Sequence, residues 1–205
     1  MPPKKKRELE VTNDKIESSN GSKTIDAPTN NKVGTSGHNW KWNKTSTLIY
    51  GDCGTKPNSK IVGFDMDDTL IKTKSGAKFP KDSKDWVFWH EKVVPKLNEW
   101  FNKGFKIVIF TNQNGISKGH TTEAQIKQKI EDISKQIGFP IQALIASADD
   151  SYRKPSKSLW NFFVENMNDK EDVDMKNSIY CGDAAGRLKP KKDFNDTDLY
   201  IIALY

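Results

Sequence analysis

Residues 61–64 form a short apolar run that ends on a cluster of carboxylates at Asp65, Asp67 and Asp68. An apolar run of this length is typical of a strand that is buried on both faces of a sheet. Three neighbouring acids repel one another unless a positive charge lies among them, and a set of oxygen ligands suits Mg²⁺ best. The run therefore predicts a central strand with a divalent cation at its carboxyl end.

Three more apolar runs of strand length follow along the chain, and helical patterns lie between them. Thr121 or Thr122 is expected to begin the second helix, because a hydroxyl before the acidic Glu123 is a typical helix start. Alternation of strand and helix favours a parallel sheet with right-handed crossovers, so the sequence predicts an α/β fold. The expected strands are 106–110, 141–146 and 178–181, and the expected helices are 93–103, 122–137 and 159–166. Order is expected to begin near Trp40, with 40–50 forming one further strand.

Polar residues stand where the expected strands end, and parallel sheets bind their ligands at that edge. We expect these side chains to meet there. They are Asp65 after the first strand, Thr111, Asn112 and Gln113 after the second, Arg153 and Lys154 after the third, and Asp183 after the fourth.

An Asp, a Thr, a Lys and a second Asp on successive strand ends resemble the four motifs of the haloacid dehalogenase-like phosphohydrolases. The resemblance implies a three-layer, Rossmann-like fold with a parallel central sheet and a minimal cap. It implies that Asp65 is the nucleophile, which forms an aspartyl-phosphate, and that Asp67 protonates the leaving oxygen and later deprotonates water. Mg²⁺ is then expected on Asp65, Asp183 and the backbone carbonyl of Asp67, and the phosphate on Thr111, Asn112 and Lys154.

Longer stretches resemble the 3′-phosphatase domain of the polynucleotide kinase 3′-phosphatase family. They are residues 63–76, 79–80, 85–86, 110–116, 152–155, 182–187 and 192–194, so the similarity runs from about Trp40 to the end of the chain. The resemblance implies removal of 3′-phosphates at DNA strand breaks during repair. Lys118 and Arg153 correspond to family positions that line the DNA channel, and Arg187 either holds Asp183 in place or touches DNA.

The chain departs from the family at four points. No folded module is expected before Trp40, where the animal enzymes of the family have a phosphopeptide-reading domain. The chain contains no GxxxxGK[ST] sequence, the phosphate-binding loop of the kinase, so 5′-phosphorylation is not expected. Asp68 stands where the family usually has glycine, and it adds charge beside the nucleophile. The sequence ends at 203–205, inside what resembles the last core strand, so we expect a shortened C-terminus or an incomplete sequence.

Residues 1–38 have almost no aromatic side chains and are rich in Lys, Asn, Ser and Thr, which is typical of a disordered tail. The basic block at 2–7 is of the kind that nuclear import receptors bind, so we expect a nuclear protein. The tail is also a candidate site for repair-protein partners. The phosphatase domain is expected over 39–205, as a monomer.

Bulk composition narrows the function classes only partly. A net charge of +6 agrees with a polyanionic partner such as DNA, but a solvated basic surface explains it equally well. No apolar stretch is long enough to span a membrane, and two cysteines form no disulfide framework. Trp100 and Trp160 are expected in the core, whereas Trp86 and Trp89 either join the core or stack on bases.

Two other functions stay open on the sequence alone. A capless phosphatase of small phosphoesters, such as histidinol phosphate or a sugar phosphate, would share the four motifs. A zinc-binding loop or a cap insert would favour that function, and the sequence has neither. A module that binds DNA ends without chemistry would gain nothing from repelling carboxylates near a phosphate. We therefore expect a Mg²⁺-dependent polynucleotide 3′-phosphatase.

Overall fold

The computed structural model describes residues 39–184 of the chain. Its strands are β1 (Lys41–Thr45), β2 (Leu48–Asp52), β3 (Ile61–Phe64), β4 (Ile71–Lys72), β5 (Val87–Phe88), β6 (Lys106–Asn112), β7 (Gln142–Ala146) and β8 (Ile179–Cys181). Its helices are α1 (Val93–Asn102), α2 (Glu123–Ile137) and α3 (Ser158–Met167). The tail at 1–38 with its basic block, Arg187 and the end of the chain lie outside the described residues.

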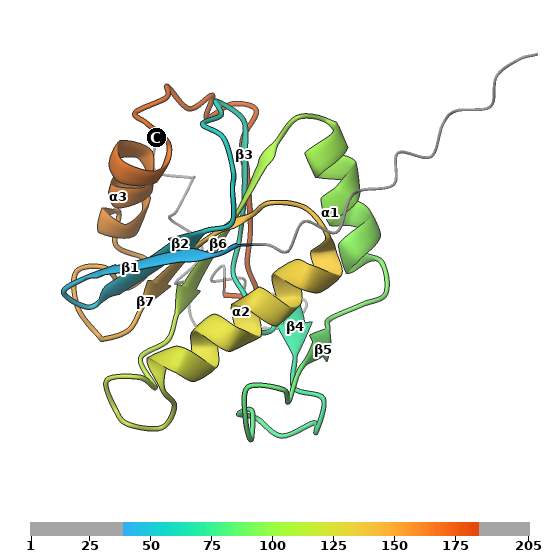
Figure 1. Ribbon diagram of the computed structural model, residues 1–205, viewed down its shortest axis with the longest axis vertical. Coiled ribbons are helices and arrows are strands. Elements are labelled where there is room, and N and C mark those ends of the chain that lie inside the picture. The colour runs from blue at the N-terminus through green and yellow to red at the C-terminus, as the bar shows by residue number, and fades with distance from the viewer. Residues whose placement is uncertain (1–38, 185–205) are drawn as a thin grey trace, which may run out of the picture. The chain divides into compact units, whose positions relative to one another are not determined.

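A six-stranded sheet runs through the domain in the order β1-β2-β7-β6-β3-β8 (Figure 1). The neighbours β7, β6, β3 and β8 are parallel, as the alternation of strands and helices predicts. The first six residues of β6 are all buried, because β6 lies between two parallel neighbours and both of its faces are covered. All four apolar runs are therefore confirmed as strands, with boundaries within two residues of the expected ones.

The N-terminal edge of the sheet differs from the expectation that 40–50 forms one strand. β1 and β2 form an antiparallel hairpin, in which Thr45 pairs with Leu48 across a two-residue turn. The turn residues Ser46 and Thr47 lack the glycine or asparagine that usually marks such a turn, although Ser46 has a positive φ of 51°. β2 then pairs antiparallel with β7, so the sheet is mixed at this edge.

The helices cover both faces of the sheet and complete the three expected layers (Figure 1). Side chains alternate along β6, with Ile107 and Ile109 on one face and Val108 and Phe110 on the other. The first pair packs with apolar residues of α1 and α2, and the second pair packs with those of α3. The core thus fixes β6 from both sides, and with it the residues that follow at its carboxyl end.

Helix α2 begins and ends at well-defined caps. The Thr122 hydroxyl accepts the backbone N–H of Gln125, and the Gln125 side chain accepts the backbone N–H of Thr122, which confirms the predicted helix start. Gly138 ends the helix with a left-handed φ of 87°, a conformation that favours glycine. The N-terminal cap holds the first turns of α2 beside the loop that follows β6.

The loop 73–86 joins β4 to β5 and projects beyond them at the end of the domain where the loop that follows β6 also projects (Figure 1). Asp85 holds this loop together, because its carboxylate accepts the Ser75 hydroxyl and backbone N–H, both at 2.7 Å, and the Lys81 backbone N–H at 2.9 Å. These bonds, the Ser75 hydroxyl first, lower the pKa of Asp85 to about 2. The loop is therefore a small, internally bonded cap, as the expected minimal cap requires.

The four tryptophans singled out by the sequence differ in burial. Trp160 and Trp86 are buried, and Trp100 is partly buried with its ring edge-on to Phe105. Trp89 is 46% exposed, and the ammonium of Lys72 lies over its ring. Trp86 is thus a core residue, and Trp89 is not. No helix within residues 39–184 is long and apolar enough to cross a membrane.

Candidate active site

The ends of β3, β6 and β8 bring the predicted site residues to one edge of the sheet. Phe64 pairs with Cys181 in the register of β3 and β8, and the Asp65 N–H continues that ladder by donating to the Cys181 carbonyl at 2.9 Å. Asp65 and Asp183 therefore follow directly on neighbouring strands. On the other side of β3, Phe64 pairs with Ile109, so that Thr111 lies two residues further along the same edge.

Asp65 and Lys154 form a buried ion pair at the centre of this edge. The Lys154 ammonium donates to an Asp65 carboxylate oxygen at 2.8 Å, and the two side chains are 1% and 13% exposed. The same ammonium donates to the Tyr180 hydroxyl at 2.8 Å. A lysine held here neutralises the carboxylate of Asp65, the predicted nucleophile, and can offer positive charge to a phosphate at this edge. The structure thus brings the predicted residues of the first and third motifs together, and their catalytic roles stay predictions.

Asn112 fixes the backbone of Lys154. Its side-chain oxygen accepts the Lys154 N–H at 2.9 Å, and its side-chain nitrogen donates to the Lys154 carbonyl at 3.2 Å. These two hydrogen bonds join the end of β6 to the loop that carries Lys154. The side-chain amide of Asn112 thus positions Lys154, and its contact with phosphate stays a prediction.

Gln113 links two predicted catalytic residues. Its side-chain nitrogen donates to the Asp67 carboxylate at 2.6 Å and to the Thr111 hydroxyl at 2.8 Å. Gln113 was expected at this edge of the sheet but without a role, and Tyr180 was not predicted to be a site residue. Gln113 lies two positions after Thr111, and the two-residue period of a strand could have placed it on the same face. Tyr180 gives no comparable signal, because its partner Lys154 is distant in sequence.

Asp68 follows the nucleophile in a left-handed conformation, with φ of 56°. Glycine adopts this conformation without strain, which gives a physical reason for the glycine usual at this position in similar sequences. Partial burial and then the charge of Asp67 raise the pKa of Asp68. Beside it, the Thr69 hydroxyl is buried with no hydrogen-bond partner among the described residues.

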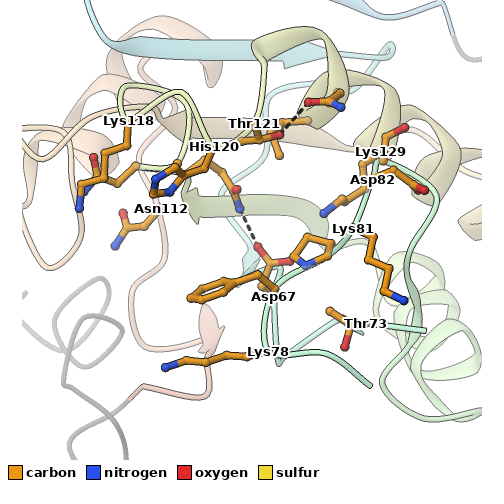
Figure 2. Close-up of a pocket in the computed structure, with 18 of the residues that line it drawn as sticks. Asp67, Thr73, Lys78, Lys81, Asp82, Asn112, Lys118, His120, Thr121 and Lys129 are labelled. Atoms are coloured by element: carbon orange, nitrogen blue, oxygen red, sulfur yellow. Dashed lines mark hydrogen bonds between the residues drawn. The ribbon is translucent and has the colours of Figure 1, made fainter. Parts of the chain in front are cut away.

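A cavity of about 620 Å³ opens beside Asp67 (Figure 2). Its walls come from the cap loop, the loop 113–121 and the first turns of α2. Lys118 and Arg153, which the sequence predicts to contact DNA, both line it, and the Arg153 guanidinium also pairs with Asp149 at 3.3 Å. Two of the three predicted DNA contacts therefore share one cavity with Asp67, the predicted acid–base residue.

The predicted magnesium ligands are oxygen atoms at the ends of neighbouring strands. Within residues 39–184, no group of three or more His, Cys, Asp or Glu side chains is gathered as a metal cluster. The predicted set needs only two carboxylates, Asp65 and Asp183, with the backbone carbonyl of Asp67. Mg²⁺ usually keeps several of its waters, so three oxygen donors at adjoining strand ends fit it. These residues would hold the ion.

Comparisons with known proteins show the family of this chain. The sequence profile described as polynucleotide kinase 3 phosphatase matches residues 60–203. A bifunctional polynucleotide phosphatase/kinase of Schizosaccharomyces pombe is 40% identical over 160 residues, which cover 78% of this chain and 38% of that protein. A polynucleotide 3′-phosphatase of Arabidopsis thaliana is 31% identical over 175 residues, which cover 78% of this chain and 24% of that protein. The chain thus spans well under half the length of these two relatives.

Other similarities lie outside the polynucleotide enzymes. A protein described as a probable D-glycero-D-manno-heptose-1,7-bisphosphate 7-phosphatase of Thermoplasma volcanium is 32% identical over 132 residues, covering 60% of this chain and 85% of that protein. Among solved structures, a HAD-like phosphatase of Mesorhizobium loti superposes with a TM-score of 0.61 at 16% identity, covering 79% of this chain and 78% of that one. The second similarity shows the fold alone. With a HAD-like fold and a family profile that matches most of its length, the chain belongs to the polynucleotide kinase 3 phosphatase family.

Proposed function

We propose that this protein is a Mg²⁺-dependent polynucleotide 3′-phosphatase that removes 3′-phosphates from DNA strand-break ends in repair. The observation that carries the proposal is the buried ion pair of Asp65 and Lys154, which joins a nucleophile and a phosphate-binding cation at one strand edge. Membership of the family and the names of two relatives support a polynucleotide as the substrate. The cationic lining of the adjoining cavity supports a polyanion.

In the proposed reaction Asp65 attacks the phosphorus of the 3′-phosphate and forms an aspartyl-phosphate, while the bond from phosphorus to O3′ breaks. Asp67 gives its proton to O3′, so the strand leaves with a 3′-hydroxyl. A water then attacks the aspartyl-phosphate, Asp67 takes a proton from that water, and phosphate departs with Asp65 restored. Lys154 and Thr111 hold the non-bridging oxygens in both steps. Bound Mg²⁺ supplies charge neutralisation between the carboxylates and the phosphate.

A phosphatase of small phosphoesters is the second candidate, and the similarity to the heptose bisphosphate phosphatase favours it. Both functions use the same carboxylates and lysine, so the reacting groups do not separate them. The surroundings of the reacting groups favour the polynucleotide. The cavity beside Asp67 is large, and six lysine or arginine side chains line it against three aspartates. A module that only binds DNA ends is disfavoured, since it has no use for a nucleophile held beside a lysine.

The test compares phosphate release from a 3′-phosphorylated oligodeoxynucleotide with release from histidinol phosphate and heptose 1,7-bisphosphate, with Mg²⁺ and with chelator. We expect kcat/KM for the oligonucleotide to exceed the others by at least about 100-fold, and chelator to abolish turnover. Asp65→Asn should bind the oligonucleotide without turnover, which controls for contaminating phosphatases. Turnover of the small esters alone would overturn the proposal. A 5′-hydroxyl oligonucleotide with ATP checks the expected absence of kinase activity.

We also propose a nuclear location, repair-protein contacts through the tail at 1–38, and a monomeric enzyme. The basic block at 2–7 supports the location. The test replaces residues 4–7 by alanine in the full chain fused to a fluorescent protein. Loss of nuclear accumulation is expected, and an unchanged distribution would contradict it.

A further inference from the structure

Lys129, on α2, is almost wholly covered by protein and has no hydrogen-bond or ion-pair partner among the described residues. Only 2% of its surface is exposed, and its side chain points into the cavity beside the active site (Figure 2). On the same helix Lys127 and Lys135 pair with carboxylates. The Lys129 ammonium is not among the buried atoms that lack a partner, so it reaches the surface of the cavity. An anionic ligand in the cavity would give this ammonium a charge-assisted hydrogen bond.

The cavity lies on the leaving-group side of the active site. Asp67 and Asp68 line it, but the nucleophile Asp65 and its partner Lys154 do not. In the proposed mechanism the O3′ atom receives its proton from Asp67. The sugar on that oxygen, and the strand beyond it, must therefore extend into the space next to Asp67. At about 620 Å³, this cavity has room for more than a phosphate group.

The charges around Lys129 favour an anionic strand in this cavity. Six lysine or arginine side chains line it against three aspartates, Asp67, Asp68 and Asp82. Lys78 and Lys81 belong to the cap loop and Lys118 to the loop after β6, so the cations lie on opposite walls (Figure 2). Lys129 is the one buried cation of the six. The outer lysines would attract a strand, and Lys129 would bind one defined anion.

We propose that Lys129 binds the phosphate on the 5′ side of the nucleotide that carries the 3′-phosphate. This contact would make the cavity a subsite that separates polynucleotide ends from small phosphomonoesters. The inference rests on the proposed function. A nucleoside 3′-monophosphate lacks the 5′-phosphate and cannot make the contact. A nucleoside 3′,5′-bisphosphate and an oligonucleotide both supply it.

The test uses Lys129→Met, with Lys127→Met as the control that removes one charge from the same helix outside the cavity. The substrates are thymidine 3′-monophosphate, thymidine 3′,5′-bisphosphate and a 3′-phosphorylated hexathymidylate. Loss of a charge-assisted hydrogen bond should lower kcat/KM about tenfold or more for the last two substrates. Turnover of thymidine 3′-monophosphate by Lys129→Met should be unchanged, and Lys127→Met should match the wild type on all three substrates.

A binding measurement separates the contact from effects on chemistry. Fluorescence anisotropy with a hexathymidylate that ends in a 3′-hydroxyl reports strand binding alone. We expect Lys129→Met to reduce the slope of log Kd against log salt by about 0.7, the value for one contact with single-stranded DNA. Lys129→Gln should behave alike, and both variants should keep the wild-type Tm, because the Lys129 ammonium makes no hydrogen bond or ion pair with the described residues.

Different results would overturn the proposed function and the Lys129 subsite. If the wild-type enzyme turns over the hexathymidylate no better than thymidine 3′-monophosphate, the proposed function fails. If the wild type prefers the hexathymidylate but Lys129→Met loses the same factor on all three substrates, or loses nothing, the subsite is wrong. An unchanged salt slope in both Lys129 variants would also overturn it.

Discussion

Asp68 combines an unusual backbone conformation with an unfavourable charge. Its φ of 56° lies in the left-handed region, which aspartate and asparagine tolerate better than most residues. Its raised pKa shows that the surroundings, burial first and Asp67 second, disfavour the ionised carboxylate. The Asp68 side chain is exposed, so solvent screens much of this repulsion. The position can therefore be tested for backbone and charge separately.

Asp68→Asn keeps the backbone preference and removes the charge, whereas Asp68→Val removes both. We expect Asp68→Asn to keep or raise the free energy of unfolding at pH 7 and to lower KM for a 3′-phosphorylated oligonucleotide, since one repelling charge leaves the cavity. Asp68→Val should lose about 1–2 kcal/mol of stability, because a β-branched residue is strained at positive φ. Urea unfolding and steady-state kinetics measure the two effects. Equal stability of the Asn and Val variants would contradict the backbone argument.

Gln113 holds Asp67, the proposed acid–base residue, because its side-chain amide donates to the Asp67 carboxylate and to the Thr111 hydroxyl. Gln113→Met keeps the length of the side chain but donates no hydrogen bond, so the Asp67 carboxylate can rotate away from the leaving oxygen. We expect kcat to fall about tenfold or more with a smaller change in KM, since positioning acts on the transition state. Gln128→Met, on the exposed side of α2, is the control. A rise in KM with unchanged kcat would assign Gln113 to substrate binding instead.

At the scale of elements, regular strands and helices were predictable and the contacts between elements were not. The apolar run at 61–64 and the capped helix at 122–137 are local signals, and the structure confirms both. The hairpin of β1 and β2 was missed, because its turn at 46–47 has no marker residue. Tyr180 was not predicted, because it bonds to Lys154, which is distant in sequence and comes near only in the folded domain. The order of the motifs was enough to predict that the proposed reacting groups meet at one edge of the sheet, since each follows its own strand.

We expect the order of the cap loop 73–86 to depend on the side chain of Asp85. Asp85→Asn cannot accept all the hydrogen bonds from Ser75 and Lys81, so the loop 73–86 should loosen while the core keeps its packing. We expect faster backbone hydrogen exchange at 75–81, an almost unchanged Tm, and a lower kcat/KM for oligonucleotides, because Lys78 and Lys81 lose their places in the cavity wall.

The pH dependence of this loop follows from the Asp85 carboxylate. Its pKa of about 2 lies below that of an unfolded aspartate, so its stabilising effect is full above about pH 4 and is lost only as pH falls through 2. Hydrogen exchange at 75–81, corrected for intrinsic rates, should therefore stay constant between pH 5 and 8. Loosening within that range would show that another titrating group controls the loop.

Across the whole domain, the candidate active site lies at the carboxyl ends of the parallel strands, and a second polar cluster lies at their amino ends. Lys106 begins β6 there with 5% exposure, and its ammonium donates to the Met167 carbonyl at 2.9 Å and to the Asn168 side chain at 3.0 Å. Asn168 also exchanges hydrogen bonds with the backbone of Asn58, which joins α3 to the segment before β3. Burial lowers the pKa of Lys106 to about 8, although Asp52 partly opposes this.

The stability of the domain should therefore rise with pH as Lys106 loses its proton. The folded state releases this proton near pH 8 and the unfolded state only near 10.5, so the unfolded state binds more protons in between and the free energy of unfolding increases. We expect a gain on the order of 2 kcal/mol across this window. Burial raises the pKa of Cys53 and Cys181, and these thiols lose stabilising effect as pH passes about 9, so they oppose the gain. The measurement is therefore urea unfolding of the full chain and of Lys106→Met from pH 7 to 9, where only the wild type should become more stable. Parallel curves for the two proteins would show that Lys106 is not the titrating group.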